Sequence, residues 1–300
     1  MRNIPKAALF AAVLLAAGAD GHAAEAVKFR MNAPVYVDGK GAGIKLPEGV
    51  GCRGGSLLVA DTGNGRILRY AMSEGSWTPG AEIVLPQLPN PIRAEANSRG
   101  EIFVLDGKVR RIARISPSGE FQGYIAVSGD VQGAVVPRSF RIDKNDNLFV
   151  LDVFSARILV LDPAGKMQRQ IPFPKEYGFF SDLAVDSGGN ILLVDSVQGR
   201  VYKAAKDSAA VLPLSASLKE DAYFPVSIAA DGRGNIYLVD QNGGGILILG
   251  QDGAVRGRRL SMGWKDGFLR YPAHMCVNEI GNVFIADRGN NRVEAFTIVE

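Results

Sequence analysis

The sequence predicts an all-β protein, a six-bladed β-propeller whose blades are four-stranded and antiparallel. Three observations predict this fold. A short run rich in Val, Ile and Leu that ends in aspartate recurs six times. The six aspartates are 43 to 47 residues apart, which is the length of one propeller blade. Within each unit, Gly, Asp and Asn turn residues divide the chain into four short strands.

Each unit carries the same pair of charged residues around its second turn. The second strand ends in aspartate, and five residues later the third strand begins with arginine in every unit but the fifth, which has Gly245. We interpret the pair as structural, because the carboxylate can accept backbone N–H groups of the hairpin while the arginine lies across from it. The members are Asp61, Asp106, Asp152, Asp195, Asp240 and Asp287, with Arg66, Arg111, Arg157, Arg200 and Arg292.

The first 24 residues are predicted to be a signal peptide. Arg2 and Lys6 precede an apolar run over 7–17, and small residues then allow cleavage near Ala19 or Ala24. We therefore expect an exported protein, periplasmic or extracellular, whose residues 25–300 form one propeller domain. The expected blades span 44–86, 90–127, 136–172, 180–214, 224–261 and 271–300. Because the last unit supplies three strands, we expect an N-terminal strand within 26–37 to close that blade.

Composition excludes several classes of protein. The chain has 34 Lys and Arg against 31 Asp and Glu, so no polybasic footprint indicates nucleic-acid binding. Beyond the N-terminal segment no run of 18 apolar residues indicates a membrane span. Two cysteines exclude a cysteine-rich zinc finger, and no Cys-x-x-Cys-His motif is present for covalent haem. Cys52 and Cys276 lie on the inner strands of the first and last blades, where we expect them to form a disulfide that closes the ring; the alternative is two buried free thiols.

The repeat resembles the NHL repeat of exported bacterial propellers. The segments SIAADGRGNIYLVD (227–240) and VFIADRGNNRV (283–293) carry the resemblance, which extends over residues 44–300 and departs at Phe180 and Gly245. It implies a six-bladed propeller. NHL-type propellers include RNA-binding modules, sensor domains, protein-interaction platforms and a few enzymes, so the resemblance specifies architecture rather than chemistry.

Residues that break the repeat are the candidates for a site at the mouth of the central channel. A residue at the start of each inner strand, proline in most units, lies 14 or 15 residues before the aspartate. Positions two and four after it face the channel, and blades 2 and 3 place charged residues there. The cluster is either a buried salt bridge that fills the channel or an anion-binding pocket. Its candidate members are Arg93, Glu95, Arg138, Arg141, Asp182 and His274.

Aromatic residues gather in the loops that lead into blades 4 to 6. They either pack at the blade edges or form an exposed protein-binding surface beside the arginines. The candidate binding residues are Phe179, Phe180, Tyr223, Phe224, Trp264 and Tyr271.

The function predicted from these features is a scaffold that binds another envelope or extracellular protein or peptide through the channel-mouth face. No catalytic residue and no metal ligand is assigned. With His274 as the one histidine outside the predicted signal peptide, a zinc site of several histidines is excluded. A calcium site of the lactonase type would have Asp182 at the required level, with Glu48 and Glu95 near it. The alternative function is therefore a metal-dependent hydrolase or lyase, lactonase-like, with its site at the central channel.

Overall fold

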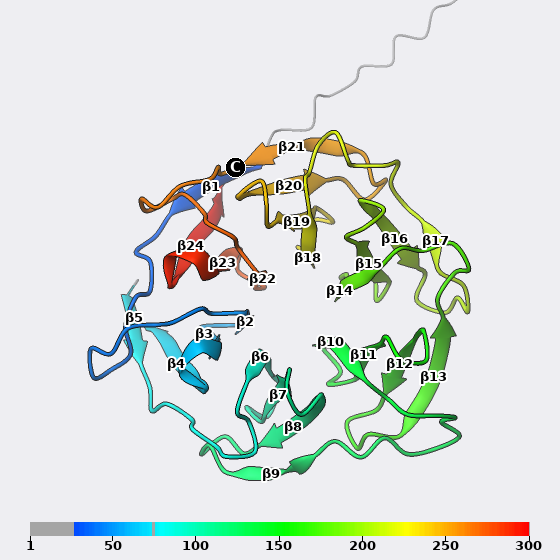
Figure 1. Cartoon of the computed structure of the whole chain (residues 1–300), viewed down its shortest axis with the longest axis horizontal. Coiled ribbons are helices and arrows are strands. Elements are labelled where there is room, and N and C mark those ends of the chain that lie inside the picture. Colours follow the sequence, from blue (N-terminus) through cyan, green and yellow to red (C-terminus); the bar gives the residue numbers. More distant parts are fainter. Residues whose placement is uncertain (1–26, 74–75, 300) are drawn as a thin grey trace, which may run out of the picture.

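The six predicted blades are present and form a ring (Figure 1). The computed structural model describes residues 27–73 and 76–299, so the predicted signal peptide lies outside the described residues. Every blade is a sheet of four antiparallel strands, which confirms the predicted fold class. In the described part of the chain, no helix is long and apolar enough to cross a membrane.

The blades follow one another along the chain, with the innermost strand first. Blade 1 contains β2 (Gly49–Arg53), β3 (Ser56–Asp61), β4 (Arg66–Ser73) and β5 (Ser76–Pro79). Blade 2 contains β6 (Pro91–Ala96), β7 (Ile102–Asp106), β8 (Arg111–Ile115) and β9 (Phe121–Tyr124). Blade 3 contains β10 (Pro137–Ile142), β11 (Leu148–Asp152), β12 (Arg157–Leu161) and β13 (Met167–Pro172).

The second half of the ring repeats the pattern. Blade 4 contains β14 (Phe180–Val185), β15 (Ile191–Asp195), β16 (Arg200–Ala204) and the short β17 (Leu212–Pro213). Blade 5 contains β18 (Pro225–Ala230), β19 (Ile236–Asp240), β20 (Gly245–Leu249) and β21 (Val255–Arg259). Blade 6 contains β22 (His274–Val277), β23 (Asn282–Asp287), β24 (Arg292–Val299) and β1 (Lys28–Met31).

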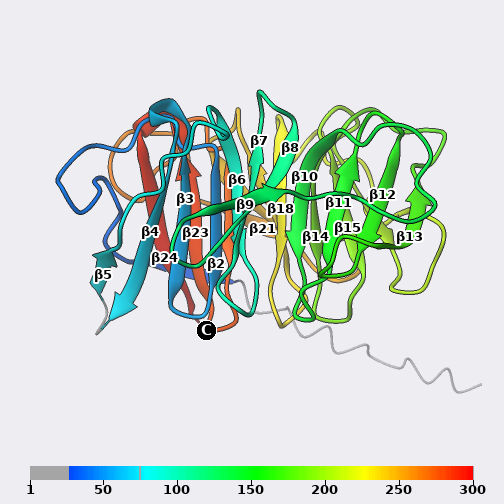
Figure 2. The same ribbon diagram turned by 90° about the horizontal axis from the view of Figure 1, so that it is seen from below.

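The N-terminal strand closes the ring, as predicted. β1 pairs antiparallel with β24, with Lys28 opposite Val299 and Met31 opposite Phe296. A strand from the beginning of the chain therefore supplies the outer edge of the last blade, next to the C-terminal strand (Figures 1 and 2).

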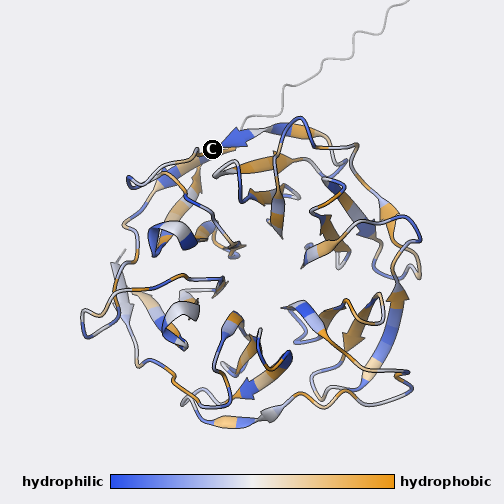
Figure 3. Cartoon of the chain, viewed as in Figure 1, coloured by the Kyte–Doolittle hydropathy of each residue, from blue (hydrophilic) through white to orange (hydrophobic). Residues whose placement is uncertain are grey.

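The hydrophobic core lies between neighbouring blades. The second strands are buried over nearly their whole length, because both faces of each sheet are covered by an adjacent blade. Apolar residues accordingly concentrate in the strands, whereas many connecting loops are polar (Figure 3). Each core cluster joins two adjacent blades; one of them packs Ile246 and Val239 of blade 5 against Met275 and Ile285 of blade 6.

The repeated aspartates organise the hairpins of each blade. Asp195 is fully buried and accepts backbone N–H groups from Gly178, Phe179, Val197 and Gln198 at 2.7–3.0 Å. The predicted carboxylate–guanidinium contacts form in three blades, as Asp61–Arg66 (2.7 Å), Asp152–Arg157 (3.0 Å) and Asp287–Arg292 (2.9 Å). These pairs therefore stabilise the blade.

In two blades the repeated aspartate or arginine has a different partner. In blade 5, where Gly245 replaces arginine, Arg258 of the outer strand reaches Asp240 at 2.8 Å. In blade 2, the guanidinium of Arg111 lies over the ring of Tyr124, 4.1 Å from its centroid. The function of the arginine is thus transferred to another strand or replaced by a cation–π contact.

The ring has two faces, which we call upper and lower. At the upper face each inner strand begins and the hairpin between the second and third strands turns; η1 (Thr62–Asn64) and η2 (Arg288–Asn290) lie there. The hairpins that follow the inner strands lie at the lower face. In Figure 2 the upper face is at the top, and the C-terminal strand ends at the bottom.

Candidate functional site

Two rings of side chains line the central channel, one above the other. Positions are counted from the residue at the start of each inner strand, which is proline in most blades. The upper ring comes from the residue two positions after it, and the lower ring from the residue four positions after it (the fourth position). Each blade contributes one residue to each ring. The lower ring is Gly51, Glu95, Arg141, Ala184, Ala229 and Cys276, and the upper ring is Gly49, Arg93, Ser139, Asp182, Ser227 and His274.

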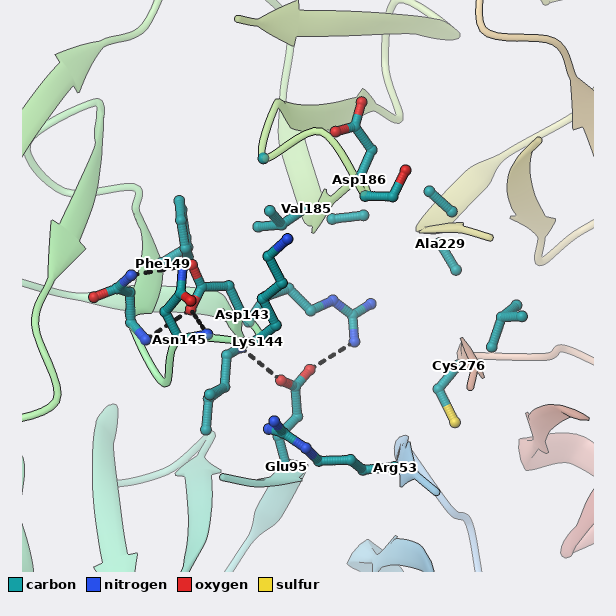
Figure 4. A pocket seen from close by; sticks show the side chains of 18 of the residues that line it. Arg53, Glu95, Asp143, Lys144, Asn145, Phe149, Val185, Asp186, Ala229 and Cys276 are labelled. Atoms are coloured by element: carbon teal, nitrogen blue, oxygen red, sulfur yellow. Dashed lines mark hydrogen bonds and ion pairs between the residues drawn. The ribbon is translucent and has the colours of Figure 1, made fainter. Parts of the chain in front are cut away.

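A cavity of about 580 Å³ opens at the lower end of the channel, and all six members of the lower ring line it. Four of the six are small, which leaves the space. Glu95 projects into it (Figure 4) and forms an ion pair of 2.8 Å with Arg141 of the neighbouring blade, which also lines the cavity. The sequence placed these two residues in the channel, and the structure brings them together at the cavity.

The upper ring is closed by a buried polar network centred on Asp182. This carboxylate is fully buried and accepts hydrogen bonds from the hydroxyls of Ser139 (2.6 Å) and Ser227 (2.7 Å). It also accepts the backbone N–H groups of Leu183 and Ile228. Burial alone would raise the pKa of Asp182, but nearby positive charge and these donors hold it well below its usual range.

Arg141 connects the two rings. Its Nε donates to the carbonyl of Leu183 (2.8 Å) and its Nη1 to Glu95. Its Nη2 lies 3.3 Å from Oδ2 of Asp182 and 3.1 Å from the carbonyl of Ile228. A guanidinium has five N–H donors, so these contacts leave one Nη1 hydrogen of this cavity-lining residue for a further acceptor.

His274 lies in the upper ring, fully buried. Its Nδ1 accepts the N–H of Val50 at 3.2 Å, and its Nε2 lies 2.9 Å from Nη2 of Arg141. Burial, followed by repulsion from Arg93 and Arg141, lowers the pKa of His274 well below 6.5, so the ring is neutral. A neutral imidazole accepts one hydrogen bond. With Nδ1 as the acceptor, Nε2 carries the proton, and it lies 3.6 Å from Oδ2 of Asp182 as well as beside the Arg141 guanidinium.

Desolvation shifts the pKa values of Arg93, which is buried, and of Glu95, which is partly buried. Desolvation raises the pKa of Glu95, although Arg141 and the Ile142 N–H, which donates at 2.8 Å, oppose the shift. Desolvation and the neighbouring arginines Arg138 and Arg141 lower the pKa of Arg93 to about 10. Arg93 donates to the carbonyl of Glu48 at 2.7 Å and does not reach the cavity.

The disulfide predicted between Cys52 and Cys276 is present, with a Cα–Cα distance of 5.9 Å. It joins β2 of blade 1 to β22 of blade 6, and both cysteines line the cavity. The bond therefore links the first and last blades at the wall of the channel.

Sequence reasoning missed the rim of the cavity. Asp143, Asp186 and Asp231 follow their inner strands and hold the lower hairpins by accepting the N–H groups two or four residues later. The lining includes five Lys or Arg and six Asp or Glu, so it is not net cationic. The cations are Arg53, Arg141, Lys144, Arg169 and Lys206, and the acids are Glu95, Asp143, Asp186, Asp207, Asp231 and Glu279. The small residues at the fourth positions were the signal that could have located this cavity.

The remaining predicted residues lie on the upper face or beneath it. Arg138 is exposed, with its guanidinium 5.6 Å from the ring centroid of Phe179. Phe180 is buried in an aromatic cluster with Phe173, Tyr177 and Tyr202, so it packs the core rather than a binding surface. Phe224 is half-buried, whereas Phe179, Tyr223, Trp264 and Tyr271 are exposed.

The calcium hypothesis has no matching ligand set among residues 27–73 and 76–299, which contain no group of three His, Cys, Asp or Glu placed to share a metal ion. Both oxygens of Asp182 already accept hydrogen bonds from the protein. Glu95 is paired with Arg141 and the Ile142 N–H. The residues at the channel therefore do not fit a metal, and no step is assigned to one.

No protein-family model matches the chain, and no curated protein matches it; the NHL resemblance is thus not confirmed. Solved six-bladed propellers share its fold. Virginiamycin B lyase from Staphylococcus aureus is 12% identical, with a TM-score of 0.63, over 91% of this chain and 100% of its own. A gluconolactonase from Xanthomonas campestris is 11% identical, with a TM-score of 0.66, over 91% and 98%. The PQQ-bound aldose sugar dehydrogenase from Streptomyces coelicolor is 14% identical, with a TM-score of 0.63, over 91% and 98%.

Proposed function

We propose that this protein is a lyase or hydrolase of small molecules, with its active site in the cavity at the lower end of the channel. The observation that carries the proposal is the Glu95–Arg141 pair at a cavity that all six inner strands line. A lyase and a gluconolactonase among the solved structures of the same fold support this class over a scaffold.

Glu95 is the proposed general base. Its burial raises the pKa of the carboxyl, which strengthens it as a proton acceptor. Hydrogen bonds from Arg141 and from the Ile142 N–H fix the position of both carboxylate oxygens. A base held in this way can remove a proton from water or from a carbon next to a carbonyl group.

Arg141 is the proposed electrophilic partner. Four of its donors are used by the protein, and the remaining Nη1 hydrogen can hold the carbonyl oxygen of a substrate as negative charge develops on it. Since the lining is close to neutral in net charge, an uncharged ester or lactone suits the cavity. Water attack on the carbonyl carbon would open such a substrate by hydrolysis. Elimination would open it when Glu95 removes a proton from the carbon next to the one that bears the ester oxygen: the C–H electrons form a carbon–carbon double bond, and the alkyl C–O bond breaks to release the carboxylate.

The test is turnover of a panel of lactones and esters, some with an abstractable proton. Both reactions release acid, and absorbance of a new carbon–carbon double bond identifies elimination. Glu95→Gln should lower the rate at least about 100-fold, whereas Glu120→Gln, exposed at the lower face outside the cavity lining, should leave it unchanged. No turnover by the wild type, or full activity in Glu95→Gln, would contradict the proposal.

Family and location belong to the same proposal. We propose that the chain is an NHL-type propeller, because its repeat keeps the Asp and Arg positions in nearly every blade. Export is supported by the disulfide, since such bonds persist in oxidising compartments. N-terminal sequencing of the secreted product would test cleavage near Ala19 or Ala24.

A second candidate function is the scaffold predicted from the sequence, which binds an envelope protein or peptide. Exposed aromatic residues on the upper face favour it, notably Tyr223 and Trp264. A partner retained by the wild type and lost from Tyr223→Ala/Trp264→Ala would support it, provided that the variant keeps its fold.

A further inference from the structure

Large apolar side chains are exposed at loop tips around the upper face. Tyr223 is 82% exposed, Trp264 77% and Phe154 69%. They belong to blades 5, 6 and 3, so the exposed tips are distributed around the ring. Further exposed apolar residues on this face are Leu46, Val109, Phe179, Val197, Met262, Phe268 and Tyr271.

The aromatic loops are held in place by the blades beneath them. The Tyr223 N–H donates to the buried Asp240 at 3.1 Å. The carbonyl of Gly263, next to Trp264, accepts from Asn290 at 2.8 Å. Binding through these side chains therefore needs little ordering of the backbone.

The same loops are cationic. The loops of the upper face are 45–48, 62–65, 107–110, 153–156, 173–179, 196–199, 216–224, 241–244, 262–273 and 288–291, and Arg138 lies beside them at the start of β10. Together with Arg138 they contain nine Lys or Arg and five Asp or Glu. The cations are Lys45, Lys108, Arg110, Arg138, Lys175, Lys219, Lys265, Arg270 and Arg288, and the acids are Glu48, Glu176, Glu220, Asp221 and Asp266.

The lower face has the opposite composition. Its described hairpins contain five Lys or Arg and ten Asp or Glu, and Ile280 is the large apolar residue exposed in them. The cations are Arg99, Lys144, Lys166, Lys206 and Arg233. The acids are Glu101, Glu120, Asp143, Asp146, Asp162, Asp186, Asp207, Asp231, Asp252 and Glu279. The ring is therefore positive and aromatic on one face and negative on the other.

We propose that the upper face docks on the anionic headgroups of a phospholipid bilayer. Trp and Tyr favour the interface between headgroups and acyl chains, and Lys and Arg are attracted to acidic lipids. A protein partner would use the same face, but protein hot spots gather in one packed pocket. Here the anchors are spread over several blades with cations between them, as suits a broad surface. Docked in this way, the cavity on the lower face opens away from the membrane.

The test measures binding to vesicles of phosphatidylglycerol mixed with phosphatidylcholine, with vesicles of phosphatidylcholine alone as the reference. The wild type should sediment with the acidic vesicles, and salt should release it. Trp264 emission should shift to shorter wavelength on binding. We expect Tyr223→Ala/Trp264→Ala to lower the partition coefficient about tenfold, and Lys175→Glu/Lys219→Glu to abolish the preference for acidic lipid.

The matched control is Ile280→Ala/Lys166→Glu, which makes the same kinds of change on the lower face and should bind like the wild type. Absence of binding to the acidic vesicles would overturn the proposal. Equal binding to both vesicle types, or loss of binding in the lower-face control, would do the same. Binding to immobilised polyglutamate without binding to vesicles would assign the face to an acidic protein instead.

Discussion

Removing the disulfide tests how the ring is held closed. Cys52 and Cys276 are separated by 224 residues. A cross-link that closes a loop of this length is worth about 5 kcal/mol in the chain-entropy model, and measured values are typically 2–4 kcal/mol. Because the bond joins β2 to β22, its loss acts on the junction of blades 1 and 6. We expect Cys52→Ala/Cys276→Ala to lose about 3–5 kcal/mol of unfolding free energy.

Chemical denaturation of the oxidised wild type, the reduced wild type and the double variant measures this loss. The reduced protein is the matched control, because it breaks the bond and keeps both side chains. Reduction and substitution should shift the denaturant midpoint to a similar extent, and in a thermal melt of the same proteins the midpoint temperature should fall by roughly 10 °C. A loss below about 1 kcal/mol in both forms would show that β1–β24 pairing closes the ring without the bond, and would refute the reasoning.

Three further predictions concern buried polar groups. Burial raises the pKa of Glu294 to about 7, above its value in the unfolded chain. The contribution of Glu294 to stability is therefore favourable at low pH and is lost as the pH rises through 7. Glu294→Gln should flatten the stability profile from pH 5 to 8 and add up to about 3 kcal/mol to the unfolding free energy at pH 8. The His274 ring should stay neutral as the pH falls through 6.5 in an NMR titration, because its pKa is lowered well below that value. A transition near 6.5 would contradict its burial. Asp195→Ala leaves four backbone N–H groups without their acceptor and should lower the unfolding free energy, measured by denaturation, by at least about 3 kcal/mol. Asp195→Asn should recover part of that loss. An unchanged midpoint would show that the carboxylate is dispensable.

The architecture could be predicted because the same local signals recur. A strand that ends in aspartate and returns through a turn to arginine requires no knowledge of distant residues, and six copies of it specify the ring. The disulfide followed from the alignment of Cys52 and Cys276 on adjoining blades. The transfer of the arginine function to Arg258 could not be predicted, since Arg258 lies on the outer strand and meets Asp240 through the fold.

The site was predicted in part. The positions of Glu95 and Arg141, counted from the start of each inner strand, placed both residues in the channel. They did not predict which end of the channel is open. Four of the blades shift register at the start of the inner strand. In blades 3 to 5, Ser139, Asp182 and Ser227 then meet in a closed network. The predicted channel mouth is therefore buried at Asp182 and His274, and the cavity lies at the other end, where the residues at the fourth positions are small.

The pairing of β1 with β24 sets an order on folding. The first strand of the domain to leave the ribosome has as its partner the last strand, with Lys28 opposite Val299. Blades 1 to 5 each have their four strands contiguous in the chain and can form during synthesis. Blade 6 is complete only after β24 has been synthesised, and its closing contact is among the most distant in the sequence, which slows folding. Until then β1 has no partner strand, so the ring closes only after all six blades have been made.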